Sequence, residues 1–202
     1  IKDLKFYKKK YPKYNFVKVT SVPNKIGEDL ENNKVIGFVR GKMEFGPRAL
    51  CNRSIIYRTN DKTINDWLNK RMNRTEFMPL APVVRNNTAR KAFINYRDND
   101  PTFDFMTSTV NCSKEFERKC PAVTHVDRTA RPQIIYKNTD PVFWEILLKW
   151  EKISGEMALV NTSFNAHEQP IICNEIESIE ALKSEMIDVL YINNIRVVKN
   201  TN

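Results

Sequence analysis

The polar segment at residues 41–54, GKMEFGPRALCNRS, combines residue types that hold an anionic ligand. Glycine lets backbone N–H groups approach a ligand closely, and lysine and arginine supply positive charge and hydrogen-bond donors for phosphate oxygens. Its candidate binding residues are Lys42, Arg48, Arg53 and Ser54. The spacing matches neither a P-loop nor a dinucleotide-binding fingerprint, and a charged loop paired with Glu44 and Asp61 explains these residues equally well.

Three further segments carry polar groups with no simple structural use. Arg74 lies in RMNRTEFMPLAP at 71–82, where a solvated helix end is the alternative. HVDRTARPQ at 125–133 holds a histidine suited to proton exchange beside phosphate-binding residue types, and a hairpin turn with a satisfied aspartate is the plainer interpretation. NTSFN at 161–165 offers neutral amide and hydroxyl donors, or else an Asx turn. The candidates in the last two segments are His125, Asp127, Thr129, Arg131, Asn161, Ser163 and Asn165.

The composition indicates a globular protein with an anionic partner. The chain has 202 residues, 41% of them hydrophobic, and a formal net charge of +9. Its apolar runs are too short to cross a bilayer, and no cationic head with an apolar run opens the chain. We therefore expect a cytoplasmic protein with no membrane partner. Four cysteines without a C-x-x-C pair, and two histidines, predict free thiols and no metal site.

A basic, aromatic lead-in segment at 1–24 precedes the main domain, which we place at 25–202. Lysines and aromatic rings are interleaved over residues 1–18, as in an arm that binds single-stranded nucleic acid. A solvated helix whose rings dock on the body of the protein is the favoured interpretation, because runs of charge usually form solvated faces.

Each polar segment follows an apolar, strand-like run, which is where α/β sheets place their ligand loops. Alternation and β-branching predict strands at 15–21, 34–41, 54–58, 79–85, 157–160 and 189–198, and a strand-turn-strand unit at 123–136. Helical spacing predicts helices at 25–33, 61–72, 88–95, 140–155 and 176–182. This order predicts an α/β fold, with helices on the faces of a mixed sheet.

Taken in order, four blocks of the chain resemble the C-terminal domain of the O-carbamoyltransferases, which include nodulation-type and antibiotic-biosynthetic enzymes. The blocks read GKMEFGPRALCNRSI (41–55), RTEFMPLAP (74–82), PAVTHVDRTARPQ (121–133) and NTSFNAHEQPII (161–172). The resemblance spans about residues 25–198, and four ordered blocks are far more specific than any one of them.

The resemblance implies a YrdC-like fold, an open twisted mixed β-sheet with helices on its faces and a cationic cavity. It implies a domain that forms carbamoyl-adenylate from carbamoyl phosphate and ATP with Mg. A preceding actin/sugar-kinase-like domain, which holds an iron site, then passes the carbamoyl group to an acceptor hydroxyl. We expect that domain as the partner of this chain, with a homodimer as a further option. The alternatives are a YrdC-like RNA-binding module, although nucleic acid is the less favoured partner, and an inactive partner domain.

The resemblance also implies roles for the candidate residues. Arg48 and Arg53 would bind phosphates beside Ser54, with Lys42 at the cavity mouth. Arg131 and Arg74 would clamp carbamoyl phosphate or the adenylate phosphate. The carbamoyl group or an α-phosphate oxygen would be held by Asn161 and Ser163, with further polar contacts from Thr129 and Asn165. His125 and Asp127 would support the site.

One residue departs from the family pattern at a sensitive position. Cys51 stands where the family usually has glycine. If the backbone there has a positive φ, a cysteine costs about 1–2 kcal/mol.

Overall fold

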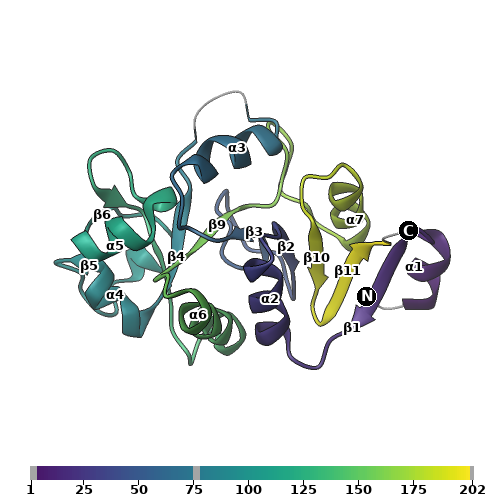
Figure 1. Ribbon diagram of the computed structural model, residues 1–202, viewed down its shortest axis with the longest axis horizontal. Coiled ribbons are helices and arrows are strands. Elements are labelled where there is room, and N and C mark those ends of the chain that lie inside the picture. The colour runs from purple at the N-terminus through teal and green to yellow at the C-terminus, as the bar shows by residue number, and fades with distance from the viewer. Residues whose placement is uncertain (1–3, 75–77, 201–202) are drawn as a thin grey trace.

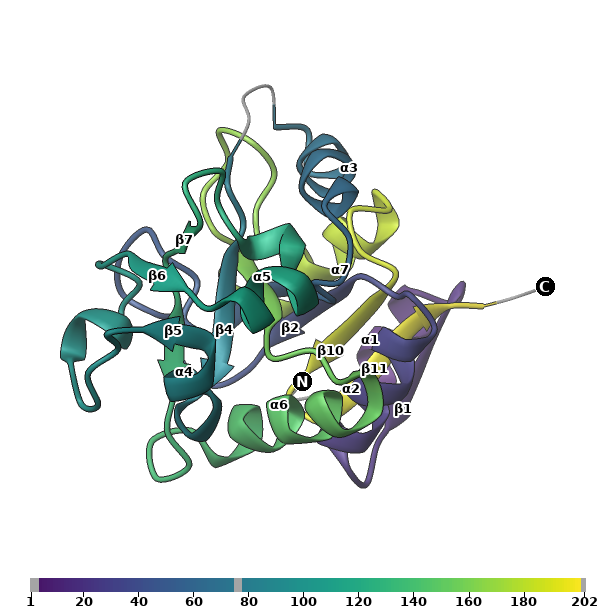
Figure 2. The same cartoon turned by 60° about the vertical axis from the view of Figure 1, so that its left-hand side comes forward.

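The computed structural model describes residues 4–74 and 78–200 and is built on an open, mixed eight-stranded sheet (Figures 1 and 2). In spatial order the strands are β1 (Tyr14–Lys18), β11 (Ile195–Lys199), β10 (Val189–Ile192), β2 (Ile36–Val39), β3 (Arg53–Tyr57), β9 (Leu159–Ser163), β4 (Ala81–Arg85) and β8 (Gln133–Ile135). The pairs β10–β2 and β4–β8 are parallel, and the other neighbours are antiparallel. The predicted α/β class with an open mixed sheet is confirmed.

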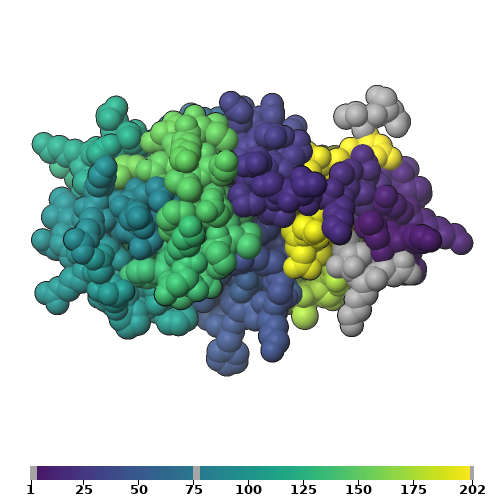
Figure 3. Space-filling model, turned by 90° about the horizontal axis from the view of Figure 1, so that it is seen from below, coloured from purple at the N-terminus to yellow at the C-terminus, as the bar shows by residue number. Residues whose placement is uncertain are grey.

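One face of the sheet is covered by α2 (Val22–Glu31) and α6 (Pro141–Ser154), which contact each other. Viewed from below, α6 in green lies beside α2 in dark purple (Figure 3). The prediction for α6 is confirmed, because the side chain of Asp140 caps its first turn, Pro141 follows, and Gly155 ends it with φ +74°.

The other elements cover the second face or extend the β8 end of the sheet. They are α3 (Thr63–Arg71), α4 (Asn86–Ala92), α5 (Lys114–Lys119), α7 (Glu175–Lys183), the 3₁₀ turns at Pro101–Phe103 and Pro121–Val123, and a small sheet of β5 (Phe93–Ile94), β6 (Val110–Cys112) and β7 (Thr129–Ala130). Figure 2 shows α3 and α7 on the opposite side of the main sheet from α2 and α6.

Two of the predicted strand units are corrected. The unit at 123–136 is not a hairpin, because β7 joins the small sheet and β8 the main one. Pro132 lies between them and has no N–H with which to continue a ladder. The single strand predicted at 189–198 is a hairpin of β10 and β11, which turns at Asn193 with φ +54°.

Within the lead-in segment, the described residues form the helix α1 (Leu4–Lys10) followed by β1. Tyr11 is buried and Tyr7 stacks on it with ring centroids 6.4 Å apart, whereas Phe6 is 51% exposed. β1 pairs with β11 at the edge of the main sheet. The preferred interpretation, a solvated helix with docked rings, is confirmed for Tyr7 and Tyr11 but not for Phe6, and the domain boundary after residue 24 stays a prediction.

Candidate functional site

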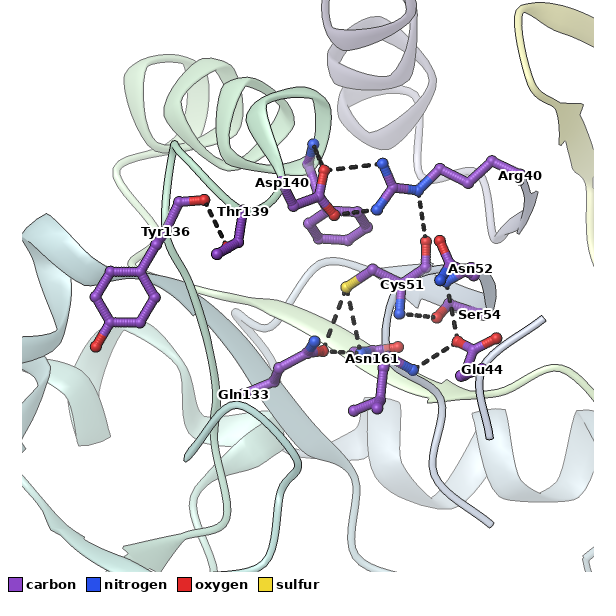
Figure 4. A network of polar contacts seen from close by, with 12 residues as sticks. Arg40, Glu44, Cys51, Asn52, Ser54, Gln133, Tyr136, Thr139, Asp140 and Asn161 are labelled. Carbon is purple, nitrogen blue, oxygen red and sulfur yellow. Dashed lines mark hydrogen bonds and ion pairs between the residues drawn. The ribbon is translucent and has the colours of Figure 1, made fainter. Parts of the chain in front are cut away.

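The loop between β2 and β3 is held in shape by the side chain of Glu44. Its Oε1 accepts backbone N–H groups of Leu50, Asn52 and Arg53 at 2.6, 2.9 and 3.1 Å. Figure 4 shows this carboxylate beside the backbone that it organises. Glu44 therefore fixes the loop through main-chain contacts, not by pairing with a cation of the loop.

The predicted phosphate ligand Arg53 is directed at the protein itself, and this assignment needs correction. Its guanidinium donates to the backbone carbonyls of Arg40, Gly41, Asn52 and Cys173, at 2.8 to 3.3 Å. Its side chain is buried, so no donor is left for a ligand. Arg53 ties the loop to the segment before α7.

Two other predicted residues of this loop also lie away from a ligand site. Ser54 is fully buried, and its Oγ accepts the backbone N–H of Cys51 at 3.1 Å. Lys42 is exposed and lines none of the cavities described below. Asp61 accepts the backbone N–H of Thr63 at 2.8 Å at the start of α3. The alternative pairing of a charged loop with Glu44 and Asp61 is therefore wrong as well.

A cavity of about 330 Å³ gathers six of the predicted residues at the end of β9. Three of them are arginines from three separate segments: Arg48, Arg74 and Arg131. The other three are Asn161, Ser163 and Asn165, from β9 and the turn after it. The remaining lining residues are Pro47, Ala49, Met78, Pro79, Ala81, Met106 and Thr162, so no carboxylate is among the described residues that line the cavity.

The three arginines line the cavity, and none of the described residues that line it with them carries a negative charge. Burial lowers the pKa of Arg131, and the nearby charge of Arg48 lowers it further. The Nε of Arg131 is buried and has no partner in the described part of the chain. Burial also lowers the pKa of Arg74, and among the described residues its donors reach the neutral oxygens of Thr162 and Asn69, at 2.9 and 3.2 Å. Unpaired cations in a partly desolvated cavity favour an anionic ligand.

β9 is a central strand, and this positions the neutral polar groups of the cavity. It pairs with β3 on one side and β4 on the other, so Asn161 lies opposite Ile56 and Ala81. Asn165, in the following turn, donates from Nδ2 to the carbonyls of Ala166 and Gln169, both at 2.9 Å. The Oδ1 atoms of Asn161 and Asn165 are buried and have no partner among the described residues.

His125, Asp127 and Thr129 form a turn outside this cavity. Asp127 accepts the backbone N–H and the hydroxyl of Thr129 at 2.9 and 2.7 Å, which lowers the pKa of Asp127. The Nδ1 of His125 lies 3.1 Å from the same hydroxyl, and burial lowers the pKa of His125. His125 lines a separate cavity of about 610 Å³. The alternative interpretation, in which Asp127 is satisfied by hydrogen bonds within the turn, is confirmed. The turn is followed by Arg131, which lines the arginine cavity.

Gln133 is a residue of the site that the sequence reasoning missed. It is buried, and its Oε1 accepts from the Nδ2 of Asn161 at 2.7 Å and from the Sγ of Cys51 at 3.3 Å (Figure 4). Cys51 has φ +74°, so the condition for its predicted backbone cost is met. The signal for Gln133 was its place at the end of the third block, two residues after Arg131.

Two further properties concern the described residues only. No helix in 4–74 or 78–200 is long and apolar enough to cross a membrane. These same ranges contain no group of three or more histidine, cysteine or acidic side chains that could hold a metal ion.

An open mixed sheet, with arginines and amides converging at the end of a central strand, defines the architecture of this α/β domain. Residues 27–199 match the family model described as Carbamoyltransferase C-terminus, and the chain belongs to this family.

The matched relatives are much longer than this chain. It is 36% identical to the uncharacterized protein MJ1051 of Methanocaldococcus jannaschii, with 93% of this chain and 36% of that protein covered. It is 33% identical to the nodulation protein NolNO of Sinorhizobium fredii, with 89% and 26% covered. The fold is similar to that of full-length HypF, solved in a phosphate- and nucleotide-bound form, with a TM-score of 0.58, 16% identity, and 90% and 22% covered.

Proposed function

We propose that this chain is the part of a carbamoyltransferase that binds carbamoyl phosphate and ATP and forms carbamoyl-adenylate. The observation that carries the proposal is the cavity at the end of β9, where three arginines meet neutral amides and hydroxyls and where the described lining contains no carboxylate. Both substrates are polyanions, so a cavity of this charge suits them. Membership of the carbamoyltransferase family supports the carbamoyl group as the one transferred.

The reaction releases both phosphate and pyrophosphate. In its balanced form, water first displaces orthophosphate from carbamoyl phosphate and leaves carbamate. A carbamate oxygen then attacks the α-phosphorus of ATP, the bond to the bridging oxygen breaks, and pyrophosphate leaves. Positioning and charge stabilisation supply most of the rate gain in such a transfer.

On this proposal, some of the residues contact the substrates and others hold the contacting residues in place. Arg48 and Arg131 hold phosphate oxygens, and Arg74 adds a partly buried charge beside them. Ser163 and Asn165 offer polar contacts from the end of β9. The supports are Glu44 and Arg53, which shape the loop, and the turn of His125, Asp127 and Thr129, which leads to Arg131.

Magnesium would be bound mainly through the nucleotide. No carboxylate is found among the described residues lining the cavity, so the protein offers no ligand of the kind that magnesium prefers. The rest of the proposed assignment concerns the longer protein: an actin/sugar-kinase-like domain with an iron site, an acceptor hydroxyl, and a cytoplasmic location.

The experiment that tests this function measures pyrophosphate release from ATP with and without carbamoyl phosphate. We expect release that requires carbamoyl phosphate and falls at least tenfold in Arg131→Ala. Arg90→Ala is the matched control, because Arg90 is exposed, pairs with Asp98 and does not line the cavity. The proposal would be overturned by pyrophosphate release that does not depend on carbamoyl phosphate, or by equal rates of release in Arg131→Ala and Arg90→Ala.

A further inference from the structure

Asn161 carries a buried amide whose orientation is fixed. Its side chain is 1% exposed and lines the arginine cavity. Its Nδ2 donates to the backbone carbonyl of Ala49 at 3.1 Å. Because a carbonyl oxygen can only accept, the nitrogen must face Ala49, and the oxygen Oδ1 faces away from it.

Gln133 reinforces this orientation from the other side. Its Oε1 accepts from the Nδ2 of Asn161 at 2.7 Å and also from the Sγ of Cys51 at 3.3 Å. Both donors converge on one oxygen, so Gln133 presents an acceptor and not its NH₂ group to Asn161. Figure 4 shows Gln133, Cys51 and Asn161 side by side in this network.

The Oδ1 of Asn161 is therefore an acceptor that still lacks a donor. It is buried, and no partner for it exists among the described residues. A buried acceptor without a donor costs stability, and a ligand N–H group can remove that cost. The phosphoryl group of the carbamoyl phosphate dianion cannot fill this role, because its fully ionised oxygens can only accept hydrogen bonds.

We propose that Asn161 determines the specificity of the cavity by accepting a hydrogen bond from the amino group of the carbamoyl moiety, with Gln133 as its positioning residue. This inference rests on the proposed function. In carbamoyl phosphate the amino group is separated from phosphorus by one carbon and one oxygen. A group that recognises it must lie beside phosphate-binding arginines, and Asn161 shares its cavity with Arg48 and Arg131. The amino group of adenine lies at the far end of ATP from its phosphates.

The test compares the affinities of carbamoyl phosphate, acetyl phosphate and orthophosphate by titration calorimetry. Acetyl phosphate replaces the amino group with a methyl group of similar size. Wild-type protein should bind carbamoyl phosphate at least tenfold more tightly than acetyl phosphate. Asn161→Leu should reduce this ratio to about one and leave the affinity for orthophosphate unchanged.

A second variant keeps the test decisive if Asn161→Leu does not fold. Gln133→Leu removes the acceptor that holds the amide, so the ratio should fall while orthophosphate still binds. Asn86→Ala is the matched control: it removes the oxygen that accepts from the Nε1 of Trp144 at 3.0 Å, remote from the cavity lining, and should leave the ratio unchanged.

The outcomes separate the two proposals. Equal binding of carbamoyl and acetyl phosphate by wild-type protein would overturn the role of Asn161 and leave the proposed function standing. Failure of wild-type protein to bind carbamoyl phosphate, orthophosphate or ATP would overturn the proposed function itself. A loss in Asn161→Leu of the preference for ATP over inosine triphosphate, with the carbamoyl preference intact, would assign Oδ1 to adenine and contradict the inference.

Discussion

At the scale of single residues, the type of a side chain in a motif does not reveal where it points. Arg48 and Arg53 stand five positions apart in one block, yet only Arg48 lines the cavity. The guanidinium of Arg53 donates its hydrogen bonds to backbone carbonyls, including that of Cys173, which is 120 residues away in sequence. Such a partner appears only after folding, so the sequence predicts the charge of the segment but not the separate uses of its arginines.

A buried carboxylate outside the cavity gives a pH prediction. Burial raises the pKa of Glu156 more than the hydrogen bonds from Thr59 and the charge of Arg58 lower it. The folded state therefore binds this proton more tightly than the unfolded state, so the contribution of Glu156 to stability falls as pH rises from the ordinary glutamate range through the raised pKa.

The check on Glu156 is denaturant unfolding of wild type and Glu156→Gln across pH 4 to 8. Gln keeps an oxygen for Thr59 but cannot ionise. The free energy of unfolding of wild type should fall relative to the variant as pH rises over this range. A difference that is flat, or that grows in favour of wild type, contradicts the assigned cause.

At the scale of elements, local sequence signals predict a helix and its ends correctly where the capping residues and the hydrophobic periodicity agree. The Asp140-Pro141 start and the Gly155 stop predicted α6, and those residues cap it in the structure. The signals failed where a segment changes sheets: the residues of β7 and β8 are too close in sequence to look like members of two sheets. The propensities of the residues likewise could not predict which non-glycine residues have a positive φ, such as Cys51.

The turn before β3 carries a prediction about Cys51, whose φ is +74° and whose side chain is fully buried. Cys51→Ala and Cys51→Gly both lose the contact between Sγ and Gln133, but only glycine relieves the left-handed backbone. The Gly variant should therefore be more stable than the Ala variant by about 1 kcal/mol. Urea unfolding of the two variants measures this order, and an Ala variant that is equally stable or more stable would show that the turn is unstrained.

At the scale of the whole molecule, long-range pairing joins the two ends of the chain. The N-terminal strand β1 lies beside β11, and Figure 1 shows both at one end of the sheet, away from β4. The opposite edge of the sheet is β8. The α/β class with a mixed sheet followed from the order of helices and strands, and the resemblance implied that the sheet is open. The strand order could not be predicted in this way, because it depends on contacts between distant segments, such as the pairing of Tyr14 with Lys199.

A buried ion pair links α2 to the C-terminal hairpin in this arrangement. Asp29, buried on α2, accepts from the hydroxyl of Tyr191 at 2.6 Å and from Nε and Nη2 of Arg196 at 2.8 and 2.6 Å. Asp29→Ala leaves Arg196 without its counter-charge and should cost about 3 kcal/mol of unfolding free energy.

The control for Asp29 is Glu180→Ala, which breaks the exposed pair with Lys183 and should cost less than about 1 kcal/mol. Chemical denaturation compares the two. Equal losses would mean that the buried pair does not hold the hairpin to α2.

The measurement that tests the central claim most directly is calorimetric titration of this chain with carbamoyl phosphate and with ATP, repeated with Arg131→Ala. The cavity at the end of β9 predicts that wild-type protein binds both ligands, and that the variant binds them at least tenfold more weakly while remaining folded. Binding that is unchanged by Arg131→Ala, or no binding of either ligand by wild-type protein, would contradict the claim that this cavity holds the substrates.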